Sequence, residues 1–81
     1  MEKFVKINEK VYNTRNLQMG KIVQTTDDKY YFMVWSPESV FEIESRQYES
    51  FEGADYAQDT LIRFLNRAMA SPMMELPKIE I

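Results

Sequence analysis

The stretch from Lys29 to Glu44, KYYFMVWSPESVFEIE, decides how this chain folds. Its first part, Tyr30 to Trp35, is an uninterrupted run of aromatic and aliphatic residues, which is typical of a strand covered on both faces. Pro37 interrupts the run, because proline has no amide hydrogen for a strand ladder. Apolar and acidic residues then alternate from Val40 to Glu44, which is the period of a strand with one face in water. We therefore predict a β-hairpin here.

The residues before this hairpin carry further strand signals. Residues 4–13 have the pattern of a short hairpin with a turn at 8–10. Residues 17–25 alternate loosely between apolar and polar, and Gly20 among them predicts a bulge or a close approach of another backbone. The aspartates of residues 26–28 suit a turn, because their side chains can bond nearby backbone amides.

After residue 50 the period of the apolar residues becomes helical. Ser50 suits the N-cap position, and Pro72 is expected to end the helix around Ala70 or Ser71. A helix of about twenty residues, packed across an antiparallel sheet, gives a domain of two layers. Its apolar face repeats at spacings of three and four residues. That face comprises Phe51, Ala54, Ala57, Leu61, Phe64, Leu65 and Ala68.

The predicted fold class is α+β, with an antiparallel sheet of four to five strands packed against one C-terminal helix. We expect residues 1–72 to form a single domain and residues 73–81 to be an apolar C-terminal tail. This tail is expected to be disordered, or to be an arm that adds as a strand to a sheet edge of the same chain or of a neighbour. The predicted core consists of Val5, Ile7, Ile22, Tyr30, Phe32, Val34, Phe41, Ile43, Leu61, Phe64, Leu65 and Ala68.

The composition argues against catalysis and against a bound metal or cofactor. The chain has no histidine and no cysteine, so the commonest general base and the strongest nucleophile are missing. Its two glycines form no phosphate-binding motif. Glu52, Asp55 and Asp59 share one helical stripe, which could bind a divalent ion but is more typical of a solvated helix face. We expect no enzyme, no metal site and no cofactor.

Location is inferred from what the sequence lacks. No segment approaches the roughly 18 consecutive apolar residues that cross a membrane, and the first residues lack the apolar core of a secretory signal. The absence of cysteine fits a reducing compartment. We expect a cytoplasmic protein without a membrane partner.

The aromatic strand supplies the main candidate binding residues. If its even-numbered side chains face the helix, then Tyr31, Met33 and Trp35 line the opposite face beside Val40. An apolar patch of that size marks an interaction surface unless the chain covers it. The cover could be the chain's own hairpin or tail, a second copy, a foreign protein or stacked nucleobases. At 81 residues, with no disulfide, the chain has a small core, which favours a homodimer.

Charge is distributed unevenly along the chain. Residues 1–24 carry five basic side chains against two acidic ones, whereas residues 38–59 carry seven acidic against one basic. The pI of about 4.9 argues against nucleic acid as a partner. The candidate acidic surface comprises Glu42, Glu44, Glu52, Asp55 and Asp59. Such a surface can simply keep a protein soluble, or it can occupy a basic groove meant for nucleic acid.

The sequence therefore predicts a small non-catalytic protein-interaction module, homodimeric, that acts through the aromatic sheet face, the acidic surface or both. A foreign protein partner is the other possibility for the same surfaces. Two alternatives remain open. The first is a domain that binds single-stranded nucleic acid, with lysines of the N-terminal strands as its groove. The second is an acidic inhibitor, of the phage or mobile-element type, of an enzyme that handles nucleic acid.

Overall fold

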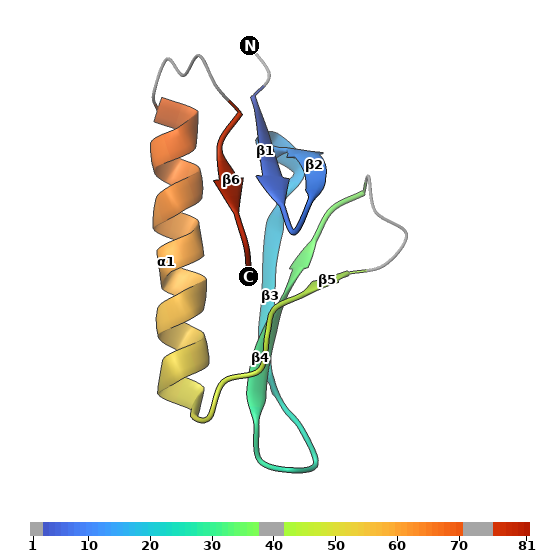
Figure 1. Ribbon diagram of the computed structural model, residues 1–81, viewed down its shortest axis with the longest axis vertical. Coiled ribbons are helices and arrows are strands. Elements are labelled where there is room, and N and C mark those ends of the chain that lie inside the picture. Colours follow the sequence, from blue (N-terminus) through green and yellow to red (C-terminus); the bar gives the residue numbers. More distant parts are fainter. Residues whose placement is uncertain (1–2, 38–41, 71–75) are drawn as a thin grey trace.

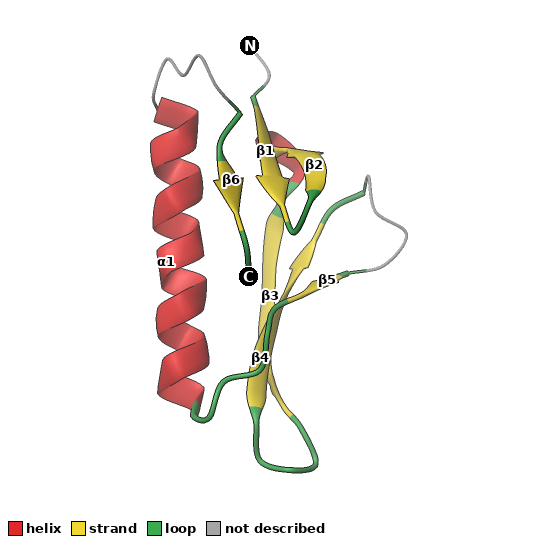
Figure 2. Cartoon of the chain, viewed as in Figure 1, coloured by secondary structure: helices red, strands yellow, loops and turns green. Residues whose placement is uncertain are grey.

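The computed structural model describes residues 3–37, 42–70 and 76–81. The chain is α+β, as the sequence predicted (Figure 2). The molecule is elongated, with principal extents of 42 × 25 × 18 Å. The elements in chain order are β1 (Phe4–Ile7), β2 (Lys10–Asn13), the 3-10 turn η1 (Thr14–Asn16), β3 (Gln18–Gln24), β4 (Tyr30–Trp35), β5 (Ile43–Glu44), α1 (Phe51–Ala70) and β6 (Lys78–Ile79).

The strands form two sheets of three, so the single antiparallel sheet of four to five strands is not confirmed. In the first sheet, β1 pairs antiparallel with β2 on one side and parallel with β6 on the other. In the second, β4 pairs antiparallel with β3 and with β5. The break falls at η1, where the Asn13 side chain accepts a hydrogen bond from Arg15 N–H and Leu17 N–H donates to the Thr14 carbonyl. These local bonds turn the chain, and β3 leaves the first sheet.

Helix α1 begins and ends as the sequence predicted. The Ser50 hydroxyl accepts a hydrogen bond from Gly53 N–H at 3.0 Å, which satisfies an otherwise unpaired amide of the first turn. Glu52 in the first turn and Arg67 in the last turn complement the helix dipole. Figure 1 shows α1 running along the long axis beside the strands, with the tip of the β3–β4 hairpin extending beyond the start of the helix.

The core lies between α1 and the inward faces of both sheets. Of the predicted core, the buried residues are Val5, Ile7, Phe32, Val34, Ile43, Leu61, Leu65 and Ala68. Ile22, Tyr30 and Phe64 are half-buried, and Phe41 lies outside the described residues. Tyr12 and Ile81 are buried core residues that the sequence did not predict.

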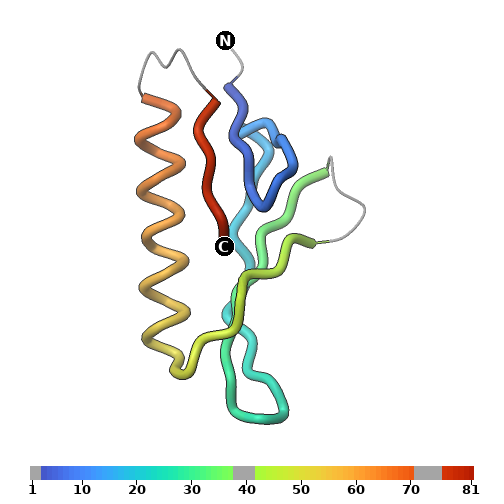
Figure 3. Tube along the Cα trace, in the orientation of Figure 1, coloured from blue at the N-terminus to red at the C-terminus, as the bar shows by residue number. Residues whose placement is uncertain are grey.

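Residues 76–81 return along the chain's own first strand. β6 lies between α1 and β1 (Figure 3), and Lys6 N–H donates to the Pro77 carbonyl at 2.8 Å. Ile81 connects the two sheets, because its N–H donates to Asn8 Oδ1 at 2.9 Å and its carbonyl accepts from Arg46 N–H at 2.7 Å. The described part of the tail is therefore a strand added within the same chain. Residues 73–75 lie outside the described residues.

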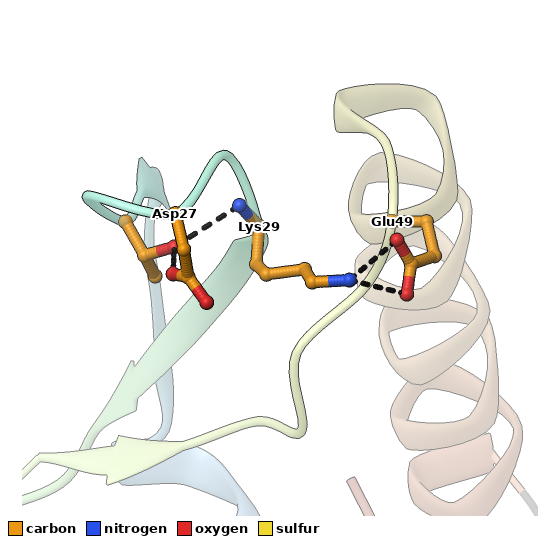
Figure 4. A network of polar contacts seen from close by, with 4 residues as sticks. Asp27, Lys29 and Glu49 are labelled. Carbon is orange, nitrogen blue, oxygen red and sulfur yellow. Dashed lines mark hydrogen bonds and ion pairs between the residues drawn. The ribbon is translucent and has the colours of Figure 1, made fainter.

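The turn of the β3–β4 hairpin is held by its own polar side chains (Figure 4). The Thr25 hydroxyl donates to Asp27 Oδ1 at 2.6 Å and accepts from Lys29 N–H at 3.0 Å. Asp28 has a φ of 60°, a left-handed conformation that aspartate tolerates better than most residues. Lys29 Nζ donates to both carboxylate oxygens of Glu49, which ties the hairpin to the segment before α1.

The carboxyl group of Asp27 in this turn is expected to make the stability of the fold depend on pH. The hydrogen bond from the Thr25 hydroxyl, followed by the backbone amide of Asp27 itself, holds the pKa of Asp27 below its ordinary value. A depressed pKa in the folded state stabilises the fold above the ordinary aspartate pKa of about 3.9, and this contribution disappears as the pH falls through the lower folded value. We expect Asp27→Asn to lower the melting temperature at pH 6 and to lower it less at about pH 2. Equal losses at both pH values would contradict this assignment.

Candidate functional site

The two faces of β4 differ in burial. Phe32 and Val34 are fully buried and belong to the core beneath α1. Tyr31 and Met33 are half-buried, Trp35 is 42% exposed, and none of these three belongs to the core. Because successive side chains of a strand point to opposite faces, these three lie on the face turned away from α1.

The strand register identifies the neighbours of Tyr31, Met33 and Trp35 on the face of the sheet turned away from α1. Val23 lies opposite Tyr31 and Gln18 opposite Trp35 in β3, and Glu44 lies opposite Met33 in β5. Residues directly opposite in an antiparallel pair share a face of the sheet. We call the resulting surface the outer face. It consists of Gln18, Lys21, Val23, Tyr31, Met33, Trp35 and Glu44. Val40, which the sequence placed beside this surface, lies outside the described residues.

Lys21 reaches the outer face because β3 contains a bulge. The register shifts between Met19 and Ile22, so Gly20 and Lys21 together face Met33. Met19 and Ile22 pack against the core, which leaves exposed Lys21 on the other side of the strand.

Gly20 makes this bulge possible, as the sequence predicted. A Cβ atom at this position would lie 2.9 Å from the Met33 carbonyl oxygen, too close for any residue with a side chain unless the backbone shifts. The Gly20 carbonyl accepts a hydrogen bond from Gln58 Nε2 of α1 at 2.8 Å. The helix therefore fixes the bulge from the inner side of the sheet.

At the level of Met33, the outer face thus carries one charge of each sign, on either side of the central strand. Lys21 lies on the β3 side of Met33 and Glu44 lies on the β5 side, at the same level along β4. Among the described residues, neither takes part in an ion pair. Both charges are therefore available to a partner.

The predicted acidic residues are all exposed but do not form one surface. Glu44 lies on the outer face, whereas Glu52, Asp55 and Asp59 lie on α1, which packs on the other side of the sheet. Asp59 forms an ion pair with Arg63 at 2.6 Å. Within the described ranges, no three acidic side chains lie close enough together to hold a metal ion.

The lysines considered for a nucleic-acid groove are also separated. Lys6 and Lys10 belong to the β1–β2 hairpin, and Lys29 is paired with Glu49. Lys3 donates to the Met69 carbonyl of α1. Of these lysines in the described part of the chain, Lys21 is the one on the outer face, so it has no basic neighbour there from this set.

Sequence reasoning missed a groove of about 290 Å³ between α1 and β6. Its floor includes the buried Phe32, Leu61 and Ile81, and Arg46, Tyr48 and Tyr56 contribute to its rim. The groove exists because β6 pairs with β1 instead of continuing away from the helix. The strand spacing of Ile79 and Ile81 was the available signal, but it did not indicate where the strand would pair.

No helix in the described residues combines the length and the apolarity needed to cross a bilayer.

Comparison with known proteins gives no further information about the site. Neither a protein-family model, a curated protein nor a solved structure matches the chain.

Proposed function

We propose that the protein is a small non-catalytic interaction module that self-associates as a homodimer through the outer face. The observation that carries this proposal is the exposure of Trp35 beside Tyr31 and Met33, on a face that makes no part of the core. Tryptophan and tyrosine are the residues most enriched where binding energy concentrates in protein interfaces. A cluster of large apolar side chains on one sheet face is the usual form of such a surface.

The size of the outer face sets the expected affinity. Strands lie about 4.8 Å apart and rise about 3.4 Å per residue, so the face spans at most roughly 14 Å across three strands and roughly 24 Å along β3, with β5 contributing only Ile43–Glu44. Two such faces amount to roughly 700 Å² in total, which is below the roughly 1,200–2,000 Å² of standard specific interfaces and in the range of weak, transient contacts. We therefore expect weak association, with a dissociation constant of about 100 µM, which is about −5.5 kcal/mol in binding free energy.

The charges of the outer face support a second copy as the partner. In a two-fold symmetric interface the same patch meets itself, so both members of every ion pair must lie on that patch. Lys21 and Glu44 meet this requirement. A nucleic-acid partner would need clustered basic residues, and a basic groove would need clustered acidic ones. Neither kind of cluster lies beside Trp35 in the described residues.

The proposal is tested by measuring mass by light scattering over a concentration series from about 1 µM to 1 mM. We expect the mass to rise from 9.7 kDa towards twice that value, with a midpoint of about 100 µM. A mass of 9.7 kDa at every concentration would remove the homodimer. In that case, salt-sensitive quenching of Trp35 by a single-stranded oligonucleotide would favour the nucleic-acid alternative.

A further inference from the structure

We infer that the two copies stack with their β4 strands running in the same direction, so that Lys21 of each copy pairs with Glu44 of the other. The two-fold axis then runs along β4, in the plane between the two outer faces. This inference rests on the proposed self-association and specifies its geometry.

Two opposite charges flank Met33 on the outer face. Met33 lies in the central strand, with Lys21 in the strand on one side and Glu44 in the strand on the other. Because neighbouring strands are about 4.8 Å apart, the backbones of Lys21 and Glu44 are separated by about 10 Å across the sheet. The outer face therefore has a positive side and a negative side, with its apolar residues in between.

Two simple symmetric arrangements place this face against itself. If the two-fold axis runs along β4, the β3 side of one copy covers the β5 side of the other, and Lys21 meets Glu44 twice. If the axis runs across β4, each side covers its own equivalent, so Lys21 meets Lys21 and Glu44 meets Glu44. Like charges placed together weaken an interface, whereas opposite charges stabilise it. The charges therefore select the axis along β4.

The dimensions of packed sheets allow these pairs to form. Face-to-face sheets lie about 10 Å apart, a distance that a lysine and a glutamate side chain span together. Aligned sheets are rotated by about 30° because each is twisted, and the long side chains accommodate such a rotation.

Other polar groups near the outer face are compatible with this arrangement. Arg46 points its Nε towards the Ile81 carbonyl at 3.5 Å and lines the groove beside α1, so its charge is directed away from the outer face. Glu42 is exposed just before β5, where the uncharged Gln18 of the second copy can donate a hydrogen bond to it.

The test uses two charge-reversed variants, Lys21→Glu and Glu44→Lys, alone and mixed. Each variant alone would place like charges together at both sites of its homodimer, and we expect its self-association to weaken about tenfold. In a 1:1 mixture, both opposite-charge pairs are restored across the mixed dimer, so its affinity should return to that of the native chain. The chain carrying both reversals should also associate as the native chain does. Lys78→Glu, an exposed site in the other sheet, is the matched control and should have no effect.

The outcomes separate this geometry from self-association itself. If the native chain dimerises, each single variant binds like the native chain and only their mixture binds more tightly, the axis runs across β4, and the arrangement along β4 is wrong while the homodimer stands. If each single reversal weakens binding and the mixture does not restore it, the pairing of Lys21 with Glu44 is also wrong. If the native chain stays monomeric at all concentrations, the proposed function and this geometry fail together.

Discussion

Replacing Phe32 with alanine is expected to lower the free energy of unfolding by about 3–5 kcal/mol. Phe32 is fully buried, belongs to the core beneath α1, and lines the groove between α1 and β6. Its backbone is fixed by Ser45, whose hydroxyl accepts from Phe32 N–H at 2.9 Å and whose N–H donates to the Phe32 carbonyl at 2.8 Å. The backbone at this position is therefore held in place, and the surrounding side chains are expected to relax only partly into the space that the ring leaves.

A loss of this size is comparable to the whole stability of the chain. Domains have roughly 0.05–0.15 kcal/mol of stability per residue, and this one has 81 residues. Urea unfolding followed by circular dichroism measures the change, with Phe32→Leu as the control because leucine leaves a much smaller cavity than alanine and should cost less. A loss under about 1 kcal/mol for Phe32→Ala would show that Phe32 is not at the centre of the core.

Replacing Trp35 with alanine is expected to weaken self-association at least about 30-fold and to destabilise the monomer less than Phe32→Ala does. Each dimer contains two copies of this residue, and truncating a tryptophan that a partner covers commonly costs about 2 kcal/mol or more. The monomer should lose less stability than with Phe32→Ala, because Trp35 is 42% exposed and lies outside the core.

Phe4→Ala is the matched control for this prediction. Phe4 is 45% exposed, which is close to the value for Trp35, but it lies in the other sheet. Sedimentation equilibrium on both variants gives the two dissociation constants. Equal weakening by Trp35→Ala and Phe4→Ala would mean that general loss of apolar surface, and not the outer face, governs association.

Local signals predicted much of this fold. Ser50 and Pro72 gave the bounds of α1, because caps and prolines act within a few residues of where they stand. The alternation through β4 gave the buried Phe32 and Val34, since the period of a strand fixes which face each side chain takes. Gly20 gave the bulge, because a backbone approach that close excludes a side chain.

The division into two sheets was not predictable in the same way. β6 pairs with β1 through residues about seventy positions apart, such as Lys6 and Lys78, and no local pattern encodes that choice. The Ile81 N–H is satisfied by the Asn8 side chain, a contact that depends on the left-handed turn at residues 8 and 9. Pairing between distant strands is decided by the packing of the whole chain.

The candidate site was predictable only where it depends on local patterns. Strand alternation alone places Tyr31, Met33 and Trp35 together. The position of Lys21 depends on the bulge, and the position of Glu44 relative to it depends on the order of β3, β4 and β5. The opposite charges around Met33 can therefore be located only once the strand register is known. The same holds for the self-complementarity of the outer face.

The fluorescence of the native chain tests the central claim most directly, because Trp35 is its one tryptophan. Across a dilution series, we expect the emission maximum to move to shorter wavelength as concentration rises, with the same midpoint as the increase in mass. Such a shift reports that water leaves the indole ring when the second copy covers it. An emission maximum that stays constant while the mass doubles would show that the chains associate elsewhere, and the outer face would no longer be the surface through which this protein acts.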